Sequence, residues 1–332
     1  MSVTRRNILE SDVARQRFLN GVVALNQEPA GITSGELGAQ IGRFLSGGRI
    51  FGQDQPLTTW DLFVAWHFVA MSIRTNPQRP LRNLAHGGPV FLPWHRLFLM
   101  RLEEQLQRVT DDATVGLPYW DWAAHGELRP AEQRQTALWG ERYLGNPRGD
   151  VTLGPLAAMR VRLDAFRMQL WSVPPRPLRR AAGQHPLGAV LPTRADVRWA
   201  MANRDYDGPQ WDAEVDSFRN RVEGWLDPNA QPGQQSVPQL HNRVHVWVGG
   251  DMEPGTSPND PVFYLNHCNE DRIWEVWMSP GPPRYRPVAG DVVAPSGHLL
   301  TDELMTLLGD PKKPSDLLDL STTYVYDSLN VG

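Results

Sequence analysis

The chain has 332 residues, with 33 Lys and Arg against 37 Asp and Glu, so its formal net charge is -4. This mild acidity argues against a nucleic-acid-binding protein, and no apolar run approaches the ~18 residues of a membrane helix. The length allows about two domains of ~150 residues, but no linker is visible, and we expect one domain over residues 1–332.

Helical patterns begin near the N-terminus, where Ser11 and Asp12 can cap a helix that carries Phe18, Val22 and Leu25 on one face. Pro93 suits the first turn of a later helix that reaches about Arg108. The full set of predicted helices comprises this first one and residues 58–72, 93–108, 211–225, a segment around 241–245, and 260–278.

Loops rich in proline, glycine and polar residues separate these helices. They are predicted at residues 75–88, 227–238 and 249–258. A longer segment, residues 123–209, has a mixed pattern that predicts mostly irregular chain with short strands. The expected fold is therefore mainly α, with a four-helix core, long irregular loops and a few short strands.

The N-terminal residues Thr4, Arg5, Arg6 and Asn7 superficially resemble a twin-arginine export signal. The apolar segment that should follow is interrupted by four charged residues, Glu10, Asp12, Arg15 and Arg17. We therefore expect a cytoplasmic protein without a signal peptide, exported only with a partner.

Several histidines lie on the apolar faces of the predicted helices. One such histidine is usually a core residue bonded to a carbonyl group, but this explanation weakens when several helices carry one. His241 and His245 are four residues apart and point the same way from one helix, and His267 lies on the next helix. His67, His86 and His95 form a second possible set, with His86 on a loop. Two such sets in one four-helix core would form a dinuclear metal site.

The residue types narrow the choice of metal. Imidazole suits zinc, copper, iron and nickel. The single cysteine, Cys268, excludes a thiolate-rich site, the H-E-x-x-H motif is absent, and no ligand candidate has the Glu spacing of di-iron bundles. Six neutral imidazoles without an anionic ligand favour a copper pair, although a zinc hydrolase and a purely structural histidine core remain alternatives.

Six stretches of the chain resemble the type 3 copper family of tyrosinases, catechol oxidases and related phenol oxidases, most closely its bacterial members. They are HGGPVFLPWHRLFLMRLEEQL (86–106), LPYWDW (117–122), LPTRADV (191–197), FRNRVEGW (218–225), HNRVHVWVGGDM (241–252) and SPNDPVFYLNHCNEDRIWEVW (257–277). The resemblance implies two copper ions. Copper A would be held by His67, His86 and His95, and copper B by His241, His245 and His267.

The resemblance also implies candidate catalytic residues. Bacterial tyrosinases use a glutamate and an asparagine to orient a water that deprotonates phenols, and Glu223 and Asn242 match these residue types. An insertion of about ten residues, within 227–239, separates the two, so the pairing requires this loop to bulge outward. Asn266 stands where the family often has histidine, and Leu84 stands where fungal and plant members have a thioether-forming cysteine.

Other residues receive expectations from the same comparison. His125, His185 and His298 match no motif and are expected at the surface or behind the ligands. Phe91 and Phe263 are expected to pack on ligand rings, and Cys268 to be a packing residue. The ending Tyr324-Val325-Tyr326 resembles the Tyr-x-Tyr of the family core, on which an N-terminal arginine packs, and Arg6 is the candidate. No C-terminal shielding domain is expected over the copper site.

The implied activity is the oxidation of phenols, o-diphenols or o-aminophenols to quinones or quinone imines with dioxygen, with possible ortho-hydroxylation of monophenols. One alternative is an o-aminophenol oxidase of secondary metabolism with little monophenolase activity. Another is a dioxygen carrier of the hemocyanin type. The implied partners are a small phenolic or aminophenolic substrate, dioxygen and a possible copper-delivery helper protein.

Overall fold

The computed structural model describes residues 2–231, 236–279, 281 and 284–332. Within them the chain is mainly helical, as predicted. The helices are α1 (Asp12–Gln27), α2 (Ser34–Ile41), α3 (Thr59–Ser72), α4 (Phe91–Thr110), α5 (Trp122–Gly126), α6 (Arg194–Ala202), α7 (Phe218–Glu223), α8 (Leu240–Val248) and α9 (Val262–Met278). In these residues no helix is long and apolar enough to cross a membrane.

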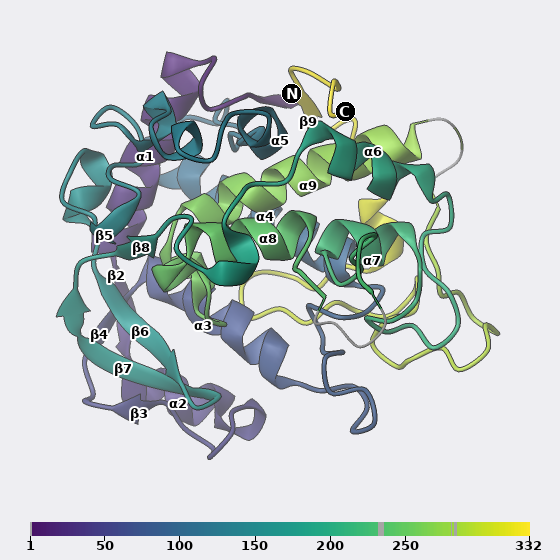
Figure 1. The fold of residues 1–332 in the computed structure, drawn as a ribbon. Helices are drawn as coiled ribbons and strands as arrows, with labels where there is room; N and C mark the ends of the chain where they lie inside the picture. Colours follow the sequence, from purple (N-terminus) through teal and green to yellow (C-terminus); the bar gives the residue numbers. More distant parts are fainter. Residues whose placement is uncertain (1, 232–235, 280, 282–283) are drawn as a thin grey trace.

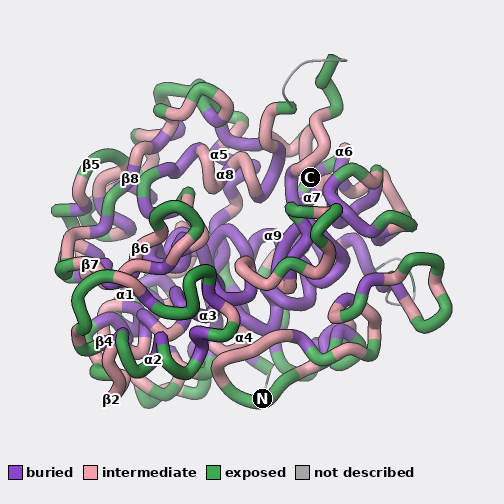
Figure 2. The backbone as a smooth tube through the Cα atoms, turned by 90° about the horizontal axis from the view of Figure 1, so that it is seen from below, coloured by how far each residue is buried: buried purple, intermediate pink, exposed green. Residues whose placement is uncertain are grey.

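Four helices, α3, α4, α8 and α9, occupy the middle of the molecule (Figure 1). The chain is mostly buried along α3 and α9, whereas exposed segments form much of the periphery (Figure 2). Helix α3 is apolar around most of its circumference and is buried from Trp60 to Ala70 except at Leu62, which is typical of a helix at the centre of a core. It begins at a capping box, in which Thr58 and Asp61 bond to each other's backbone N–H groups. The four-helix core is confirmed.

The strands are short and lie outside this core. They are β1 (Val3–Arg5), β2 (Pro29–Thr33), β3 (Phe51–Gly52), β4 (Pro56–Thr58), β5 (Arg148–Asp150), β6 (Val161–Phe166), β7 (Gln169–Arg176), β8 (Arg179–Ala181) and β9 (Tyr324–Tyr326). The order β3-β7-β6 makes a three-stranded sheet, while β2-β4, β5-β8 and β1-β9 are two-stranded. The β6–β7 hairpin has its turn at Arg167 and Met168, both with positive φ.

The two ends of the chain pair with each other. Strand β1 runs parallel to β9, with Val3 opposite Tyr324 and Arg5 opposite Tyr326, and the labels N and C lie close together in Figure 1. The buried Arg5 guanidinium stacks on Tyr324, 3.5 Å from the ring centroid. The prediction that Arg6 makes this contact is wrong, because successive strand residues point to opposite faces and this register turns Arg6 to solvent.

Two predicted segments differ from the structure. The helix expected over residues 211–225 forms only as α7, because Ser217 caps that helix and Trp211 has φ 49°. The side-chain amide of Asn220 donates to the carbonyl oxygens of Asp212 and Val215, which holds the preceding chain in a non-helical turn. The segment 123–209, expected to be irregular, contains α6, which begins at a capping box of Thr193 and Asp196.

Candidate metal centre

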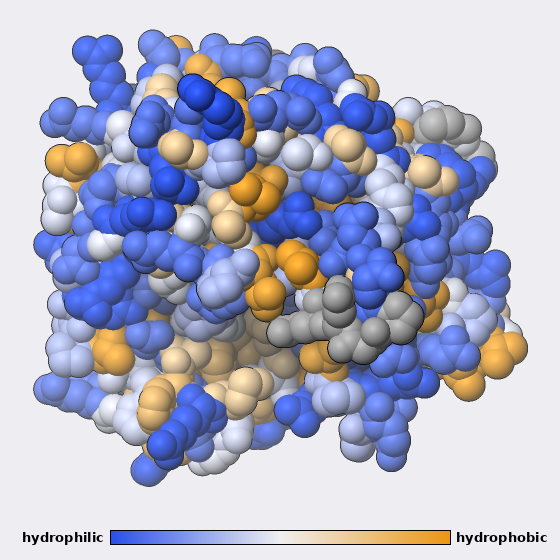
Figure 3. Space-filling model, viewed as in Figure 1, coloured by the Kyte–Doolittle hydropathy of each residue, from blue (hydrophilic) through white to orange (hydrophobic). Residues whose placement is uncertain are grey.

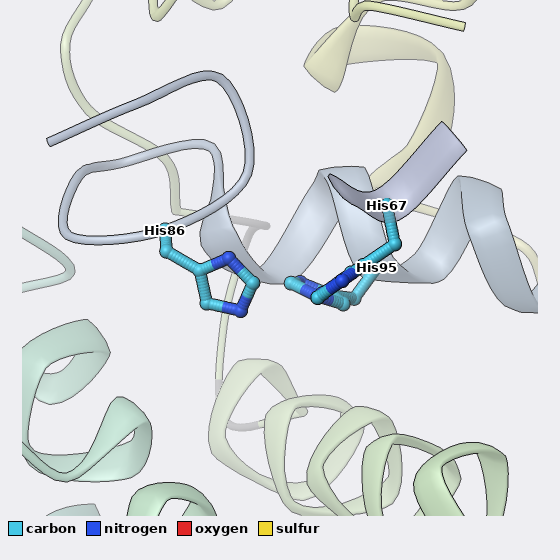
Figure 4. Close-up of side chains that lie close together, drawn as sticks. All are labelled: His67, His86 and His95. Carbon is cyan, nitrogen blue, oxygen red and sulfur yellow. The ribbon is translucent and has the colours of Figure 1, made fainter. Parts of the chain in front are cut away.

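Six histidines from the core helices and one loop form two compact groups. His67 comes from α3, His86 from the loop between α3 and α4, and His95 from α4, and Figure 4 shows their rings turned toward one another. His241 and His245 come from α8 and His267 from α9. Within each group, one ligand atom from each residue lies within 4.8 Å of the others. The structure thus brings together both predicted triads.

The two triads face each other across the core. The rings of His95 and His267 stack, with centroids 4.0 Å apart and an interplanar angle of 4°, and the ring of His241 lies 5.8 Å from that of His86. Phe263 packs on His267 with a centroid separation of 4.2 Å, and Phe91 on His241 with one of 4.9 Å. The expected packing of these two phenylalanines on the ligand rings is confirmed.

Backbone carbonyl groups orient four of the six rings through Nδ1. These contacts are His67 Nδ1 to Gly255 O (2.7 Å), His95 Nδ1 to Phe91 O (2.8 Å), His245 Nδ1 to Met252 O (2.6 Å) and His241 Nδ1 to Glu223 O (3.2 Å). Because Nδ1 donates in each contact, Nε2 keeps its lone pair and points toward the centre of the group.

The unpartnered nitrogens are the test of whether a metal pair fits. The Nε2 atoms of His67, His95, His241, His245 and His267 are buried without a hydrogen-bond partner among the described residues, and so is Nδ1 of His86. A buried polar atom without a partner costs free energy, and six such ring nitrogens in one small volume are unusual for a structural core. Metal coordination would satisfy them, so the residues fit the expected dinuclear copper site.

Burial also sets the protonation state of these rings. It lowers the pKa of His67 to about 3 and that of His245 to about 4, and it lowers the pKa of the other four well below its usual value. Neighbouring imidazoles lower the pKa of His86, His95, His241 and His267 further. The rings are therefore neutral and can donate to metal ions at physiological pH.

The loop that carries His86 is held at several points. The side-chain oxygen of Asn83 accepts from the backbone N–H groups of Ala85 (3.0 Å) and His86 (2.8 Å). Gly87 has φ 64°, and an added Cβ would lie 2.3 Å from the carbonyl oxygen of Leu81, so only glycine fits there. The Gly87 N–H donates to Oε1 of Glu223 at 2.7 Å. The loop is therefore anchored to α7 directly beside a ligand.

Glu223 and Asn242 both reach His241, but by different groups. Its Nδ1 lies 3.2 Å from the backbone oxygen of Glu223 and 3.0 Å from the side-chain oxygen of Asn242. The Glu223 carboxylate is fully buried and accepts from Gly87 and, at 3.0 Å, from Arg219. Burial raises the pKa of Glu223 above its usual value, although Arg219 and the Gly87 N–H oppose the shift.

A cavity of about 650 Å³ opens over the histidine groups. Its floor includes His67, His86, His241 and His245, and Asn242 also lines it. The end of α3, the β6–β7 hairpin and the chain around α8 form its apolar walls. Three charged residues also line it, namely Arg74, Arg167 and Glu253. Figure 3 shows this face, on which apolar side chains surround a hollow. The cavity is large enough for a small aromatic molecule.

The expected loop within 227–239 lies partly outside the described residues, at 232–235. Its described ends are tied together. Val237 N–H donates to the Asp227 carboxylate at 3.0 Å, and Gln239 N–H donates to Gly224 O at 3.0 Å. Val237 and Pro238 line the cavity, so this end of the segment borders the site.

The other three histidines have different surroundings. His298 is fully buried, with neither ring nitrogen partnered among the described residues, and His125 is buried with Nδ1 accepting from Trp120 Nε1 at 2.9 Å. His185 is half-buried. Cys268 is buried, with its sulfur 3.7 Å from Leu117 O, as expected for a packing residue.

Sequence reasoning missed Glu270, whose carboxylate lies 3.0 Å from Nδ1 of His267. A signal for it was present, because residues three apart on a helix lie on the same face. It also missed the cavity lining from the β6–β7 hairpin. Those residues carry no motif, and only the folded arrangement brings the hairpin to the site.

Comparisons with known proteins agree with this geometry. The family model for the common central domain of tyrosinase matches residues 57–279. A tyrosinase from Streptomyces lincolnensis is 41% identical over 73% of this chain and 81% of its own length. Grixazone synthase from Streptomyces griseus is 34% identical over 81% of this chain and 90% of its own length. A mutant polyphenol oxidase from Thermothelomyces thermophila has a similar fold, with a TM-score of 0.66 and 20% identity over 98% of this chain and 89% of its own.

Proposed function

This chain belongs to the tyrosinase family and is a type 3 copper phenol oxidase, and we propose that it converts small phenols, o-diphenols or o-aminophenols to quinones or quinone imines with dioxygen. One observation supports this proposal above the others. Six neutral imidazoles present unpartnered nitrogens in the core, and four of these rings form the floor of a cavity that accepts an aromatic molecule. The two histidine triads would hold the copper ions, which would supply electron transfer from the substrate to dioxygen.

The residues around the copper ions have separate tasks in this proposal. The apolar cavity walls bind the aromatic ring and exclude water from it. His86 and His241 line the cavity and belong to different triads, so one substrate can approach both metal positions. The carbonyl groups behind four of the six rings hold those imidazoles in the tautomer that leaves Nε2 free.

Monophenols also need a proton acceptor, because a phenol with a pKa near ~10 must lose its proton before it can be hydroxylated. We assign this role to Glu223 acting through a water that Asn242 orients. The assignment is supported by the position of both residues beside one ligand, since His241 Nδ1 lies near the Glu223 backbone oxygen and the Asn242 side-chain oxygen. Asn242 lines the cavity and is thus able to meet both water and substrate.

An o-aminophenol oxidase with little monophenolase activity is the second candidate. Both oxygens of the Glu223 carboxylate already accept a hydrogen bond, from Gly87 and Arg219, which reduces its capacity to hold a water. Diphenols and o-aminophenols lose electrons more readily and depend less on such a base. The similarity to grixazone synthase over most of both chains also favours this candidate.

The experiment is a comparison of three substrates with the copper-loaded protein. Tyrosine, catechol and o-aminophenol are supplied side by side, and oxygen uptake and coloured products are followed. Tyrosine turnover after a lag supports the tyrosinase activity, whereas rapid o-aminophenol turnover without tyrosine turnover supports the second candidate. Oxygen binding without turnover of any of the three would contradict both and leave a dioxygen carrier.

We also propose that a separate helper protein delivers copper. The ligand nitrogens are buried in the core, so free copper ions must pass through the cavity to reach them. The metal-free chain should therefore take up copper from a simple salt slowly and incompletely. Complete uptake of two ions per chain within minutes would contradict the need for a helper.

A further inference from the structure

We propose that Glu270 is a positioning residue for copper B, and that its negative charge strengthens His267 as a ligand and stabilises the oxidised state of that copper. The proposal rests on the copper pair and not on the identity of the substrate. Glu270 lies on α9, three residues after His267. Its Oε2 is 3.0 Å from Nδ1 of His267, and both side chains are about 1% exposed.

The surroundings of Glu270 differ from those of the other carboxylates buried in this core. Glu103 and Asp271 each pair with the Arg5 guanidinium, and Glu223 accepts from Arg219 and Gly87. Neither oxygen of Glu270 has a hydrogen-bond partner in the part of the chain that the structure describes. Burial without a partner raises the pKa of Glu270 well above its usual value in the metal-free chain, and a copper ion held by His267 would supply the positive charge that favours the ionised carboxylate.

His267 also differs from the other ligands of the two triads. Four of the six rings place Nδ1 against a neutral backbone oxygen, whereas the nearest described partner of His267 Nδ1 is a carboxylate. Its N–H and the carboxylate approach closely without full hydrogen-bond alignment. No other described residue holds the Glu270 side chain, so a small rotation can align them. The two copper positions are therefore electrostatically unequal.

This inequality has a chemical consequence. Coordination of copper through Nε2 of His267 leaves the ring proton on Nδ1. This N–H then donates a hydrogen bond to the Glu270 carboxylate. An anionic acceptor makes the imidazole a more basic ligand than a carbonyl acceptor does, and outer partners of this kind typically contribute ~10–100-fold to metal affinity. Because the site is buried, the charge acts through a medium of low dielectric constant. It favours Cu(II) over Cu(I) at copper B.

The test compares copper release from Glu270→Gln and wild-type protein in both oxidation states. Glutamine keeps the size of the side chain and an acceptor oxygen but removes the charge. In the oxidised protein, a chelator should remove one of the two copper ions ~10-fold faster from Glu270→Gln than from wild type, with the other unchanged. In the reduced protein, release should be nearly unchanged. A role limited to packing would not distinguish the oxidation states.

Glu275→Gln is the matched control, because Glu275 lies on the same helix and pairs with Arg96 rather than with a histidine. It should lower thermal stability and leave copper release at the wild-type rate. Wild-type release from oxidised Glu270→Gln, equal acceleration in both oxidation states, or the same loss in Glu275→Gln would each overturn the proposal. Glu270→Val serves as a second variant and should release the same copper at least as fast as Glu270→Gln. None of these measurements requires a substrate, so they stand apart from the test of the proposed function.

Discussion

At the scale of single residues, the site depends on imidazoles that are held through one nitrogen and offer the other. Backbone carbonyl groups accept hydrogen bonds from Nδ1 of four rings, those of His67, His95, His241 and His245. Because the rings are buried and neutral, their Nε2 lone pairs remain available, and no described side chain competes for them. Removal of one ring therefore has a clear expected effect.

Replacement of His241 by alanine should abolish oxidase activity and reduce the copper content from two ions per chain to about one. The copper B position would keep only His245 and His267, and two imidazoles bind weakly. Metal analysis and oxygen uptake measure the two effects. His185→Asn is the control: asparagine can still accept from Leu187 N–H as His185 does, so both ions and full activity should remain. A fully active His241→Ala protein with two copper ions would refute the ligand assignment.

Replacement of Glu223 by glutamine should lower monophenol turnover far more than diphenol turnover. The reason is the proton that a monophenol must lose, which a glutamine amide cannot help to remove. The substitution also weakens one of the two bonds that the carboxylate accepts from Gly87 and Arg219, so rates are compared per bound copper. If both rates fall equally, Glu223 acts only by holding the loop that carries His86.

At the scale of elements, the strand pair β1–β9 joins the chain ends to the helices that carry ligands. Arg5 on β1 lies 3.1 Å from carboxylate oxygens of both Glu103 on α4 and Asp271 on α9. Burial would raise the pKa of Asp271, but Arg96 and Arg5 outweigh this effect and hold it below its usual value. The tyrosine hydroxyl groups of β9 also donate to Asp271, each at 2.6 Å. The ends therefore brace the two helices that hold His95 and His267.

Replacement of Arg5 by alanine should destabilise the protein by about 3–5 kcal/mol, because it leaves the buried Glu103 without its cation and Asp271 with Arg96 alone. Thermal or urea unfolding measures the loss. The neighbouring Arg6 supplies the control, since it is exposed and Arg6→Ala should change stability by less than about 0.5 kcal/mol. A larger effect at Arg6 than at Arg5 would mean that the strand register is wrong.

At the scale of the whole molecule, buried neutral histidines make stability depend on pH. Burial lowers the pKa of His298 to about 3 and that of His125 to about 4, whereas an unfolded histidine titrates near ~6.5. Between these values the unfolded chain binds more protons than the folded one. Stability is therefore fully present above ~6.5 and is lost as the pH falls below it.

Each of these two histidines should cost about 1.4 kcal/mol of stability when the pH falls from 7.5 to 5.5. Urea unfolding of the copper-loaded protein at the two pH values measures the total change. His298→Leu should reduce that change by about 1.4 kcal/mol and should fold, because neither ring nitrogen has a partner to lose among the described residues. An unchanged pH dependence in His298→Leu would show that His298 takes up its proton in the folded state.

The amino-acid sequence by itself determined the mainly α fold, the bounds of most core helices and both histidine triads. These features are local. The 3.6-residue period, the caps at Ser11 and Thr58 and the four-residue step from His241 to His245 are written within single helices. The types of ligand residue also limited the choice of metal ion, because six imidazoles without a thiolate suit few ions.

Only the tertiary structure decided the features that depend on elements far apart in sequence. The register of β1 on β9, more than 300 residues away, selects Arg5 over Arg6 for the buried position. Contacts from Asn220 to the preceding chain shorten α7, and the β6–β7 hairpin completes the cavity. The isolation of Glu270 also appears only when its neighbours are in place. Whether a side chain is buried, and whether it has a hydrogen-bond partner, depends on the packing of the whole chain. No local sequence pattern therefore predicts which side chains lack a partner.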